Sequence, residues 1–408
     1  MTALMKRRML VGTSLGFIAL FLYTYHLDSP STQYFDEIYN VKTARSLVGL
    51  GPRYWTTHPM LGKVVIASGI RLFGDHPWSW RIFPALTGVA ILFVLYGLTL
   101  TLTRSRSWSV CAAALFMMAG MSIPNARIAM LNSTMLLWML LAVWAFCQYV
   151  VARSWSRRRA LLCCGLSCGL ALSTKWVALM TWELLALCLL VMFKDAPDRR
   201  TLAWETLAAL LLVPLVIYTI VETALWLGGD HGWVALWRHQ TYMLSYHTSL
   251  TATHPYGSRW IGWPLLLRPI WYAFQQEGDR VTGILCIGNP AIFWIIPPAI
   301  GYLIWQYVKD PTWTHRVIVA GFFTHWISYA VLSRVQFFYY FETALPFAIL
   351  AITLLLKRLW ESGRGGRAAV TGYLSLVVGL FIFWYPLLIG LPISHAYYQA
   401  HLWFRSWI

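Results

Sequence analysis

The sequence predicts an all-α polytopic membrane protein, and three observations support that fold class. Of its 408 residues, 59% are hydrophobic and only 12% are charged, whereas soluble domains are roughly 45–50% apolar and 25% charged. The 24 Trp and 21 Tyr residues are types that collect at the headgroup level of a bilayer. The 32 basic residues, which give a net charge of +17, lie in short clusters between apolar runs. Such clusters are typical of membrane topology signals and argue against a nucleic-acid partner.

Apolar segments of the length that crosses a bilayer, roughly 20 residues, recur along the whole chain. We expect about eleven transmembrane helices, which would put the two chain ends on opposite sides of the membrane. No separate soluble domain is visible between them, so we expect one membrane domain over residues 1–408. The segments lie near residues 9–26, 82–103, 108–125, 130–152, 160–176, 178–193, 201–226, 291–308, 317–333, 341–356 and 368–390.

The Lys and Arg residues predict the side of the membrane that each connection occupies. With a cytoplasmic amino terminus, the cytoplasmic pieces hold 18 of the 32 basic residues within 45 positions. Short cytoplasmic loops are enriched in Lys and Arg, so this orientation is favoured over the reverse. The carboxyl terminus and the two largest loops, about 27–81 and 227–290, are therefore expected on the outer side.

The first outer loop has the pattern of short amphipathic helices. From Phe35 onward, apolar side chains recur at a spacing close to helical, and polar side chains fall toward the other side. A second apolar stretch runs from Met60 to Gly74. We expect both helices to rest on the membrane surface or on the bundle. In the first helix the apolar positions are Ile38, Val41, Ala44 and Val48, and the polar positions are Asp36, Glu37, Asn40 and Thr43.

Asp36 and Glu37 are adjacent carboxylates in a chain with only 15 acidic residues. One interpretation is structural, because Asp is a good helix N-cap and Glu in the first turn favours the helix dipole. The other is catalytic, with a carboxylate acting as an acid or base. Neighbours on a helix do not face each other, so at most one of the two is expected to point at a reacting atom. The other would orient it or cap the helix.

Two basic residues lie at the outer ends of predicted spans. Lys175 has no nearby carboxylate in the sequence, and it would be either an anchor that snorkels to the headgroups or an inward-facing partner of a phosphate. Arg334 has a similar position, and Glu342 enters the next span. Arg334 would form either a structural pair with Glu342 or a second phosphate contact. The residue pattern leaves both questions open.

The second large outer loop is rich in aromatic and basic side chains, among them His247, His254 and Arg268. The spacing of the two histidines does not fit a zinc pair on a helix, and no cysteine ligands accompany them, so no metal site is indicated. Six of the seven cysteines fall within predicted spans, which leaves no disulfide framework. A loop of this composition suits a surface that covers a polar substrate or rests in the headgroups.

Five segments carry a resemblance to a known family when they are taken together, in order and spacing. Between about residues 34 and 350 the chain resembles a bacterial-type protein O-mannosyltransferase. The segments are FDEIYNVKTARSL; HPMLGKVVIASG followed by WRIFPALTGV; LSTKWVALMT; SYHTSLTATHPYGSRWIGWPLLLRPIWYAF with IGNPAIFW; and SRVQFFYYFETALPF.

The resemblance implies a fold, an activity and a location. Family members have the GT-C fold of membrane glycosyltransferases, with eleven spans in characterised members. They transfer mannose, with inversion, from a polyprenyl-phosphate-mannose donor to Ser or Thr hydroxyls of exported polypeptides. For this chain the resemblance implies the bacterial inner membrane, an active site on the outer side, and the lipid bilayer and secretion translocon as further partners. It implies no certain cofactor and leaves a divalent metal open.

The resemblance also implies roles for particular residues. Asp36 corresponds to the expected catalytic base, with Glu37 in support. Lys175 and Arg334 correspond to the expected partners of the donor phosphate. The remaining substrate-loop candidates are His58, Lys63, Arg81, His247, His254, Arg268 and Glu342.

The chain also departs from the family pattern, mainly where the acceptor would be recognised. Met60 replaces a proline in HPMLGK, FFYYF lacks the histidine that many eukaryotic members have, and loop 227–290 has no room for their globular outer domain. One rival hypothesis is an aminoarabinose-transferase-like enzyme that acts on a glycolipid or envelope polysaccharide. Another is a transporter of lipid-linked sugars, in which Asp36 would serve only as a cap. A transporter would be expected to show discontinuous helices in paired half-repeats, which the sequence does not display.

Overall fold

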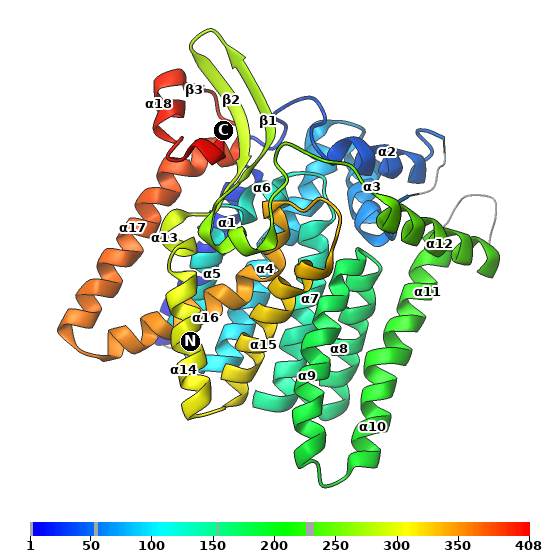
Figure 1. Ribbon diagram of the computed structural model, residues 1–408, viewed down its shortest axis with the longest axis vertical. Helices are drawn as coiled ribbons and strands as arrows, with labels where there is room; N and C mark the ends of the chain where they lie inside the picture. Colours follow the sequence, from blue (N-terminus) through cyan, green and yellow to red (C-terminus); the bar gives the residue numbers. More distant parts are fainter. Residues whose placement is uncertain (1–2, 53–55, 153–154, 226–231) are drawn as a thin grey trace.

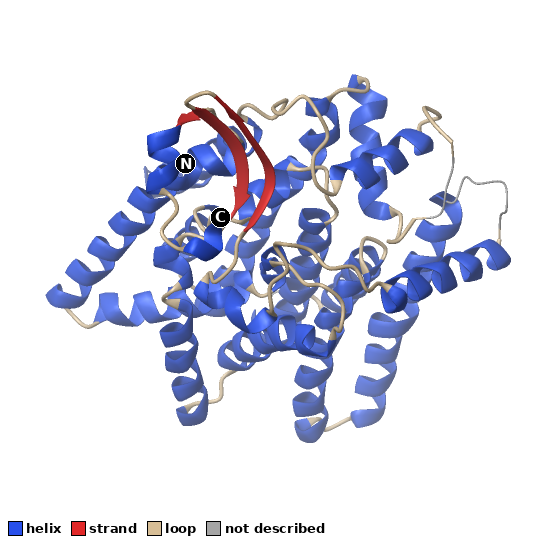
Figure 2. Ribbon diagram, turned by 45° about the horizontal axis from the view of Figure 1, so that its top comes forward, coloured by secondary structure: helices blue, strands red, loops and turns tan. Residues whose placement is uncertain are grey.

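The structure is a computed structural model that describes residues 3–52, 56–152, 155–225 and 232–408 (Figure 1). The predicted cytoplasmic pieces 1–8 and 153–159, and the start of the loop 227–290, lie partly outside these residues. The described part is a bundle of long helices that carries shorter helices and a β-hairpin at one end (Figures 1 and 2).

Each segment predicted to cross the membrane is helical over most of its length. In the part of the chain that the structure describes, six helical stretches are long and apolar enough to span a bilayer: 77–103, 132–151, 176–195, 199–223, 290–309 and 364–389. A helical membrane protein is therefore confirmed, while the number of crossings stays a prediction. The helices of the bundle are α1 (Ala3–Thr24), α4 (Pro77–Thr103), α5 (Arg106–Met117), α6 (Ser122–Arg127), α7 (Asn132–Cys147), α8 (Arg157–Leu172), α9 (Leu179–Asp195), α10 (Arg199–Leu207), α11 (Val213–Leu225), α14 (Ile296–Lys309), α15 (Trp313–Ile327), α16 (Leu345–Glu361) and α17 (Arg364–Ile389).

Short helical turns join or extend these helices. Two of them are π-helical continuations of α7 and α10, and the others are segments of one or two turns at helix ends or in connections. They are η1 (Gln148–Ala152), η2 (Trp176–Ala178), η3 (Ala208–Leu212), η4 (Trp260–Leu265), η5 (Ser328–Val331), η6 (Phe338–Thr343), η7 (Arg405–Trp407), α13 (Pro290–Phe293) and α18 (His395–Ala400).

Helix α4 lies at the centre of the bundle and packs closely on its neighbours through glycines. A Cβ atom at Gly97 would come within 2.5 Å of the Trp144 ring on α7, and one at Gly88 would come within 2.5 Å of Ala126 on α6. Small residues allow helix backbones to approach closely, which is how membrane helices gain packing energy. The close contact of α4 with α6 and α7 therefore depends on these two positions.

The two short helices predicted in the first loop are present, as α2 (Glu37–Leu47) and α3 (Leu61–Phe73). They lie side by side at the end of the bundle that also carries the hairpin (Figure 1). A third such helix, α12 (Trp233–Ser249), lies across the end of α11 at the same end of the molecule (Figure 1).

The inward face of α2 differs in part from the one that its apolar spacing predicts. Glu37, Asn40 and Thr43 are buried, whereas Ile38 is 50% exposed. The reason is that these polar side chains find partners inside the protein: the Asn40 amide, for example, donates to the Ala129 carbonyl at 3.1 Å. A buried polar group that is hydrogen-bonded loses little free energy relative to water. The amphipathic pattern located the helix and predicted the burial of Val41 and Ala44 correctly, but it placed Glu37, Asn40 and Thr43 on the wrong side.

A small antiparallel sheet corrects the all-α prediction. Strands β1 (Ile270–Glu277) and β2 (Arg280–Cys286) form a hairpin, and β3 (Ile393–Ser394) pairs with the outer part of β2. Gly278, with φ of +56°, forms the turn between residues that favour strands. The hairpin stands out from the end of the bundle (Figure 2). Its pairing with β3 attaches the chain segment after α17 to this end.

Candidate active site

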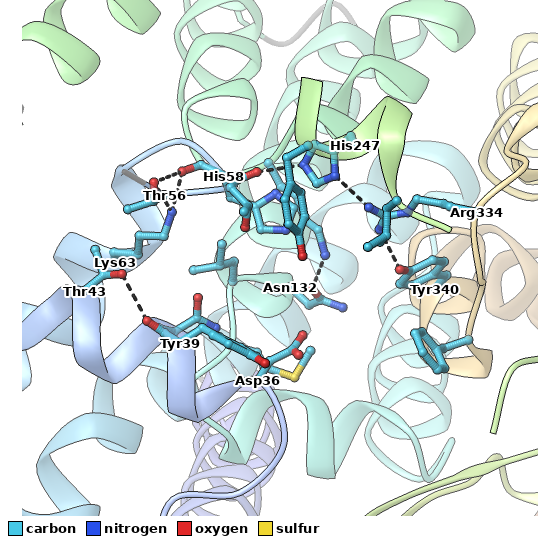
Figure 3. Close-up of a pocket in the computed structure, with 18 of the residues that line it drawn as sticks. Asp36, Tyr39, Thr43, Thr56, His58, Lys63, Asn132, His247, Arg334 and Tyr340 are labelled. Atoms are coloured by element: carbon cyan, nitrogen blue, oxygen red, sulfur yellow. Dashed lines mark hydrogen bonds between the residues drawn. The ribbon is translucent and has the colours of Figure 1, made fainter. Parts of the chain in front are cut away.

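A cavity of about 450 Å³ opens at the end of the bundle where α2, α3 and α12 lie (Figure 3). Residues far apart in the sequence line it, because the loops between bundle helices converge there. The side chains that matter for the argument are Asp36, Asn132, Lys175, His247, Arg334 and Tyr340. Among the described residues, no cluster of three or more His, Cys, Asp or Glu side chains gathers to hold a metal ion.

Asp36 borders this cavity at the start of α2 (Figure 3). It occupies the N-cap position, yet its side chain makes no capping hydrogen bond, so the structural interpretation of this carboxylate has no support in the geometry. Burial raises the pKa of Asp36, and the positive charges of Lys175, Arg334 and His254 act in the opposite direction. A carboxylate with a raised pKa that faces a cavity is suited to take up a proton.

The residue before Asp36 adopts a strained backbone conformation. Phe35 has φ of +50°, a left-handed region that residues with a Cβ rarely occupy. Its ring stacks on Tyr272 of β1 at 4.5 Å and meets the edge of Tyr339 at 5.7 Å. These contacts hold the strained turn in place and thereby fix the direction in which Asp36 leaves the backbone.

Glu37 does not line the cavity, because it is bound inside the protein by Arg81. Arg81 donates from Nε to Oε1 at 2.8 Å and from Nη2 to Oε2 at 2.9 Å, and the Ala129 amide donates to Oε1 at 2.9 Å. The remaining Arg81 donors serve the carbonyls of Leu27, Pro30 and Thr32. Arg81, predicted as a substrate-loop residue, is therefore a buried structural partner of Glu37.

Lys175 points into the protein and not toward the headgroups. Its side chain is buried, and Nζ donates to Asn132 Oδ1 at 3.1 Å and lies 5.7 Å from the centre of the Tyr340 ring. Glu342 accepts hydrogen bonds from Asn125, at 2.8 Å, and from Asn132. Glu342 lies behind the cavity wall and holds the amide that meets Lys175. The snorkelling interpretation of Lys175 is wrong for this structure.

Arg334 is oriented by two neutral side chains. Its Nη1 donates to His247 Nδ1 at 2.7 Å, and its Nη2 donates to the Tyr340 hydroxyl at 2.8 Å (Figure 3). His247 Nε2 lies 2.7 Å from the Thr57 carbonyl, which only accepts, so the ring proton belongs on Nε2. Burial and the charge of Arg334 lower the pKa of His247 to about 4, which keeps the ring neutral. The structural pair with Glu342, one of the two alternatives that the sequence left open for Arg334, is not among the ion pairs of the described residues.

The cavity therefore has an excess of positive charge. Within the described parts of the chain, neither Lys175 nor Arg334 forms a salt bridge, and the partners of both are neutral. Cations that are held in place without a carboxylate are prepared to bind an anion by charge-assisted hydrogen bonds. Asp36 supplies a carboxylate to the same cavity, so the site combines an anion-binding pair with a potential base.

The other predicted substrate-loop residues have different positions. His58 lines the cavity, with its ring 5.0 Å from that of His247. Lys63 also reaches the cavity wall, but its Nζ donates to Thr56 Oγ1 at 2.9 Å, to the Pro59 carbonyl at 3.1 Å and to the His58 carbonyl. Burial lowers the pKa of Lys63 to about 7. Lys63 thus secures its own loop and has no donor left for a ligand.

Two further candidates lie away from the cavity. His254 lines a neighbouring depression of about 580 Å³ that shares Arg334 with the cavity. Arg268 donates to the carbonyls of Pro255 and Ser406, which makes it a structural residue and corrects its predicted role. Arg81 and Glu342, described above, need the same correction.

The sequence analysis missed Asn132 and Tyr340, which position the two cations. Both left a signal in the sequence. Asn132 follows an apolar run at the start of α7, and a polar side chain there needs a partner inside the bundle. Tyr340 belongs to the FFYYF segment. That segment differs from the family pattern by its missing histidine, and its tyrosines are also polar groups near the predicted site.

Two family models match most of the chain. The model described as dolichyl-phosphate-mannose-protein mannosyltransferase matches residues 75–226. The model described as the C-terminal four TMM region of protein-O-mannosyltransferase matches residues 232–407. The two matches adjoin and lie in the order of the chain.

Curated relatives match over most of their length. The polyprenol-phosphate-mannose–protein mannosyltransferase of Mycobacterium tuberculosis is 27% identical, with 97% of this chain and 90% of the relative covered. The protein of the same name from Mycolicibacterium smegmatis is 26% identical, with 86% of this chain and 81% of the relative covered.

Solved structures share the fold. The Saccharomyces cerevisiae Pmt1–Pmt2 complex bound to the sugar donor aligns with a TM-score of 0.86 at 15% identity, covering 98% of this chain and 93% of that one. ArnT from Cupriavidus metallidurans bound to undecaprenyl phosphate aligns with a TM-score of 0.62 at 17% identity, covering 93% and 70%. At these identities the likeness concerns the fold alone.

Proposed function

We propose that this chain, which belongs to the protein O-mannosyltransferase family, transfers mannose from a polyprenyl-phosphate-mannose donor to Ser or Thr hydroxyls of exported polypeptides. The family match and the names of the relatives support the donor and the protein acceptor. The fold is shared with other membrane glycosyltransferases that use lipid-linked donors, the GT-C type.

One observation carries the assignment of the site: among the residues that the structure describes, Asp36 is the one carboxylate that lines the cavity, and it shares the cavity with Lys175 and Arg334, whose hydrogen-bond partners are neutral. Lys175 and Arg334 would bind the donor phosphate and stabilise the charge that develops as the bond between the anomeric carbon and the phosphate oxygen breaks. A phosphate leaving group needs no proton. Asp36 would accept the proton of the Ser or Thr hydroxyl while the hydroxyl oxygen forms the new bond to the anomeric carbon. A single displacement of this kind inverts the anomeric centre and requires one base.

The remaining residues of the site would position these three. His247 and Tyr340 orient Arg334, and Asn132, held by Glu342, orients Lys175. Glu37 anchors the first turn of α2, next to Asp36. This division agrees with the helix geometry, in which adjacent carboxylates face different directions.

The charge distribution of the loops supports a location for the site. The end of the bundle that carries the hairpin and the cavity lies opposite the connection between α9 and α10 (Figure 1), and the helix ends that flank this connection carry Lys194, Arg199 and Arg200. We propose that the connection is cytoplasmic and that the cavity faces the outer side of a bacterial inner membrane. The whole chain would act as one membrane domain, and exported polypeptides would reach the cavity as they leave the secretion translocon.

The rival acceptor is a glycolipid or envelope polysaccharide, and an acceptor assay separates the two. Purified protein would receive radiolabelled polyprenyl-phosphate-mannose together with a Ser/Thr-rich peptide, with the Asp36→Asn variant as the inactive control. We expect the label in the peptide. Label that appears only in a lipid fraction when membrane lipids are added would favour the glycolipid acceptor. Label that moves across vesicle membranes without covalent transfer would favour a transporter.

A further inference from the structure

Helix α12 rests on the protein through one narrow stripe of side chains. Its described buried residues are Ala235, His239 and Met243, and the half-buried His247 follows after the same interval of four residues. The opposite face is exposed, with Trp237 at 71%. A helix with so few apolar contacts depends on the polar bonds that its inward stripe makes.

Both histidines of this stripe hold the same short segment. His239 Nε2 lies 3.0 Å from the Thr56 carbonyl, and His247 Nε2 lies 2.7 Å from the Thr57 carbonyl. A carbonyl only accepts, so each Nε2 carries a proton and donates it. Two rings that are two helical turns apart are thereby attached to consecutive peptide units. Helix α12 and residues 56–57 form one unit.

Glu222 of α11 contacts both α12 and the segment that follows residues 56–57. One carboxylate oxygen lies 3.1 Å from His239 Nδ1, and the other accepts from the Met60 amide at 2.8 Å. The two nitrogens of the His239 ring are thus both engaged, one by the Thr56 carbonyl and the other by the Glu222 carboxyl group. The ion pair is almost fully buried, with exposures of 2% for Glu222 and 1% for His239. Neither residue lines the cavity.

The hydrogen bonds continue from this ion pair to the catalytic cavity. Thr56 is bound by His239 through its carbonyl and by Lys63 through its hydroxyl. The next residue, Thr57, receives the bond from His247, whose other nitrogen accepts from Arg334. The position of Arg334 therefore depends on where α12 lies, and the position of α12 depends on the ion pair.

We propose that Glu222 and His239 are positioning residues for the donor site, acting through α12, His247 and Arg334. The proposal rests on the proposed function, because it takes Arg334 as a partner of the donor phosphate. The two residues touch neither substrate nor reacting atoms. Their ion pair seats α12 so that neutral His247 meets the guanidinium of Arg334 in the orientation that receives an anion.

A matched pair of variants separates hydrogen bonding from charge. In Glu222→Gln, the amide oxygen can accept from the Met60 amide, and the amide nitrogen can donate to His239 Nδ1 of a neutral ring that still donates from Nε2. Every bond to Thr56 and Met60 is then kept. In Glu222→Leu, the Met60 amide and His239 Nδ1 lose their acceptors in a buried place, which is costly. The Gln variant is expected to retain donor affinity and the Leu variant to lose it.

The test measures the KM for polyprenyl-phosphate-mannose and kcat in purified protein. We expect Glu222→Leu to raise the donor KM about tenfold or more, Glu222→Gln to change it less than threefold or so, and Trp237→Leu, on the exposed face of α12, to leave it unchanged. His239→Gln, which can serve only one of the two acceptors, should resemble Glu222→Leu and replaces it if that variant does not fold.

The same measurement in an Arg334→Ala background decides whether the effect passes through Arg334. We expect Glu222→Leu to add little there, since residues in one network are non-additive. A donor KM that stays normal in both Glu222→Leu and His239→Gln, or an effect that is fully additive with Arg334→Ala, would overturn the positioning role. An Arg334→Ala variant with a normal donor KM would instead refute the donor role of Arg334, and with it the premise of this inference.

Discussion

Arg81 binds both carboxylate oxygens of Glu37, at 2.8 and 2.9 Å, while the neighbouring Asp36 borders the cavity. Two adjacent acids therefore have separate tasks. The bidentate pair fixes the start of α2, because Glu37 also accepts from the Ala129 amide. The fixed helix start, together with the strained Phe35 turn, determines where the Asp36 carboxylate lies.

The first prediction concerns Asp36 as the base. Asp36→Asn keeps the size of the side chain but cannot take the hydroxyl proton, so we expect kcat to fall by about 10²–10⁴-fold. The donor KM and the midpoint of thermal unfolding should remain near those of the wild type, since the Asp36 side chain caps no helix. Near-normal turnover together with a lower unfolding midpoint would instead assign a structural role to this carboxylate.

The second prediction concerns the pH dependence of turnover. The base works when it is ionised, so kcat falls as the pH drops through the pKa of Asp36. Because burial raises this pKa above its ordinary value of 3.8, the acid limb of the kcat profile should lie above that of an exposed carboxylate. Lys175 lowers the pKa of Asp36, so Lys175→Met should move the limb to higher pH. An acid limb that stays in place in this variant, measured at saturating donor, would contradict the placement of Asp36.

The third prediction compares the stability that the buried Arg81–Glu37 pair contributes with that of a surface pair. Arg81→Met leaves the Glu37 carboxylate buried without its partner, which typically costs about 3–5 kcal/mol. Arg45 and Asp75 form a pair at 2.8 Å on the surface, and Arg45→Ala should cost no more than about 1 kcal/mol. Denaturation in detergent, followed by tryptophan fluorescence, measures both. An equal loss of unfolding free energy in the two variants would show that the Arg81–Glu37 pair contributes no more to stability than the surface pair.

Much of the fold could be predicted from the sequence because membrane helices need long apolar runs. Helices α2 and α3 were also predictable from spacing, but the polar part of the buried face of α2 was not. Glu37 and Asn40 are buried because they form hydrogen bonds with Arg81 and with the Ala129 carbonyl, which come from distant parts of the chain. A pattern of apolar residues carries no information about such partners.

The hairpin and the ion pair between α11 and α12 show two different limits of prediction from the sequence. Strand-forming residues flank the turn at Gly278, so the hairpin had a local signal that the aromatic and basic character of the loop obscured. Glu222 also had a signal, since a carboxylate inside an apolar segment needs a partner. That partner, His239, lies 17 residues away on another helix. Only the fold reveals which histidine it is.

The fourth prediction concerns the anion-binding pair. Lys175→Ala and Arg334→Ala each remove a charged donor, and a hydrogen bond to a charged group contributes about 1.5–3 kcal/mol. We expect the donor KM to rise by about tenfold or more in each variant. Arg268→Ala is the matched control, because the hydrogen bonds of Arg268 go to backbone carbonyls and its guanidinium stacks on Tyr256, outside the cavity. Unchanged donor affinity in both cavity variants would remove the phosphate-binding role from these residues.

The fifth prediction concerns orientation in the membrane. Asp279 lies exposed at the tip of the hairpin, and Pro197 lies exposed in the connection between α9 and α10, at the opposite end of the molecule (Figure 1). In intact cells, a membrane-impermeant maleimide should label Asp279→Cys directly and should label Pro197→Cys only after permeabilisation. The native cysteines are buried or half-buried, so the wild-type protein provides the background. Labelling in the reverse order would place the cavity on the cytoplasmic side, where polypeptides that have already been exported cannot reach Asp36.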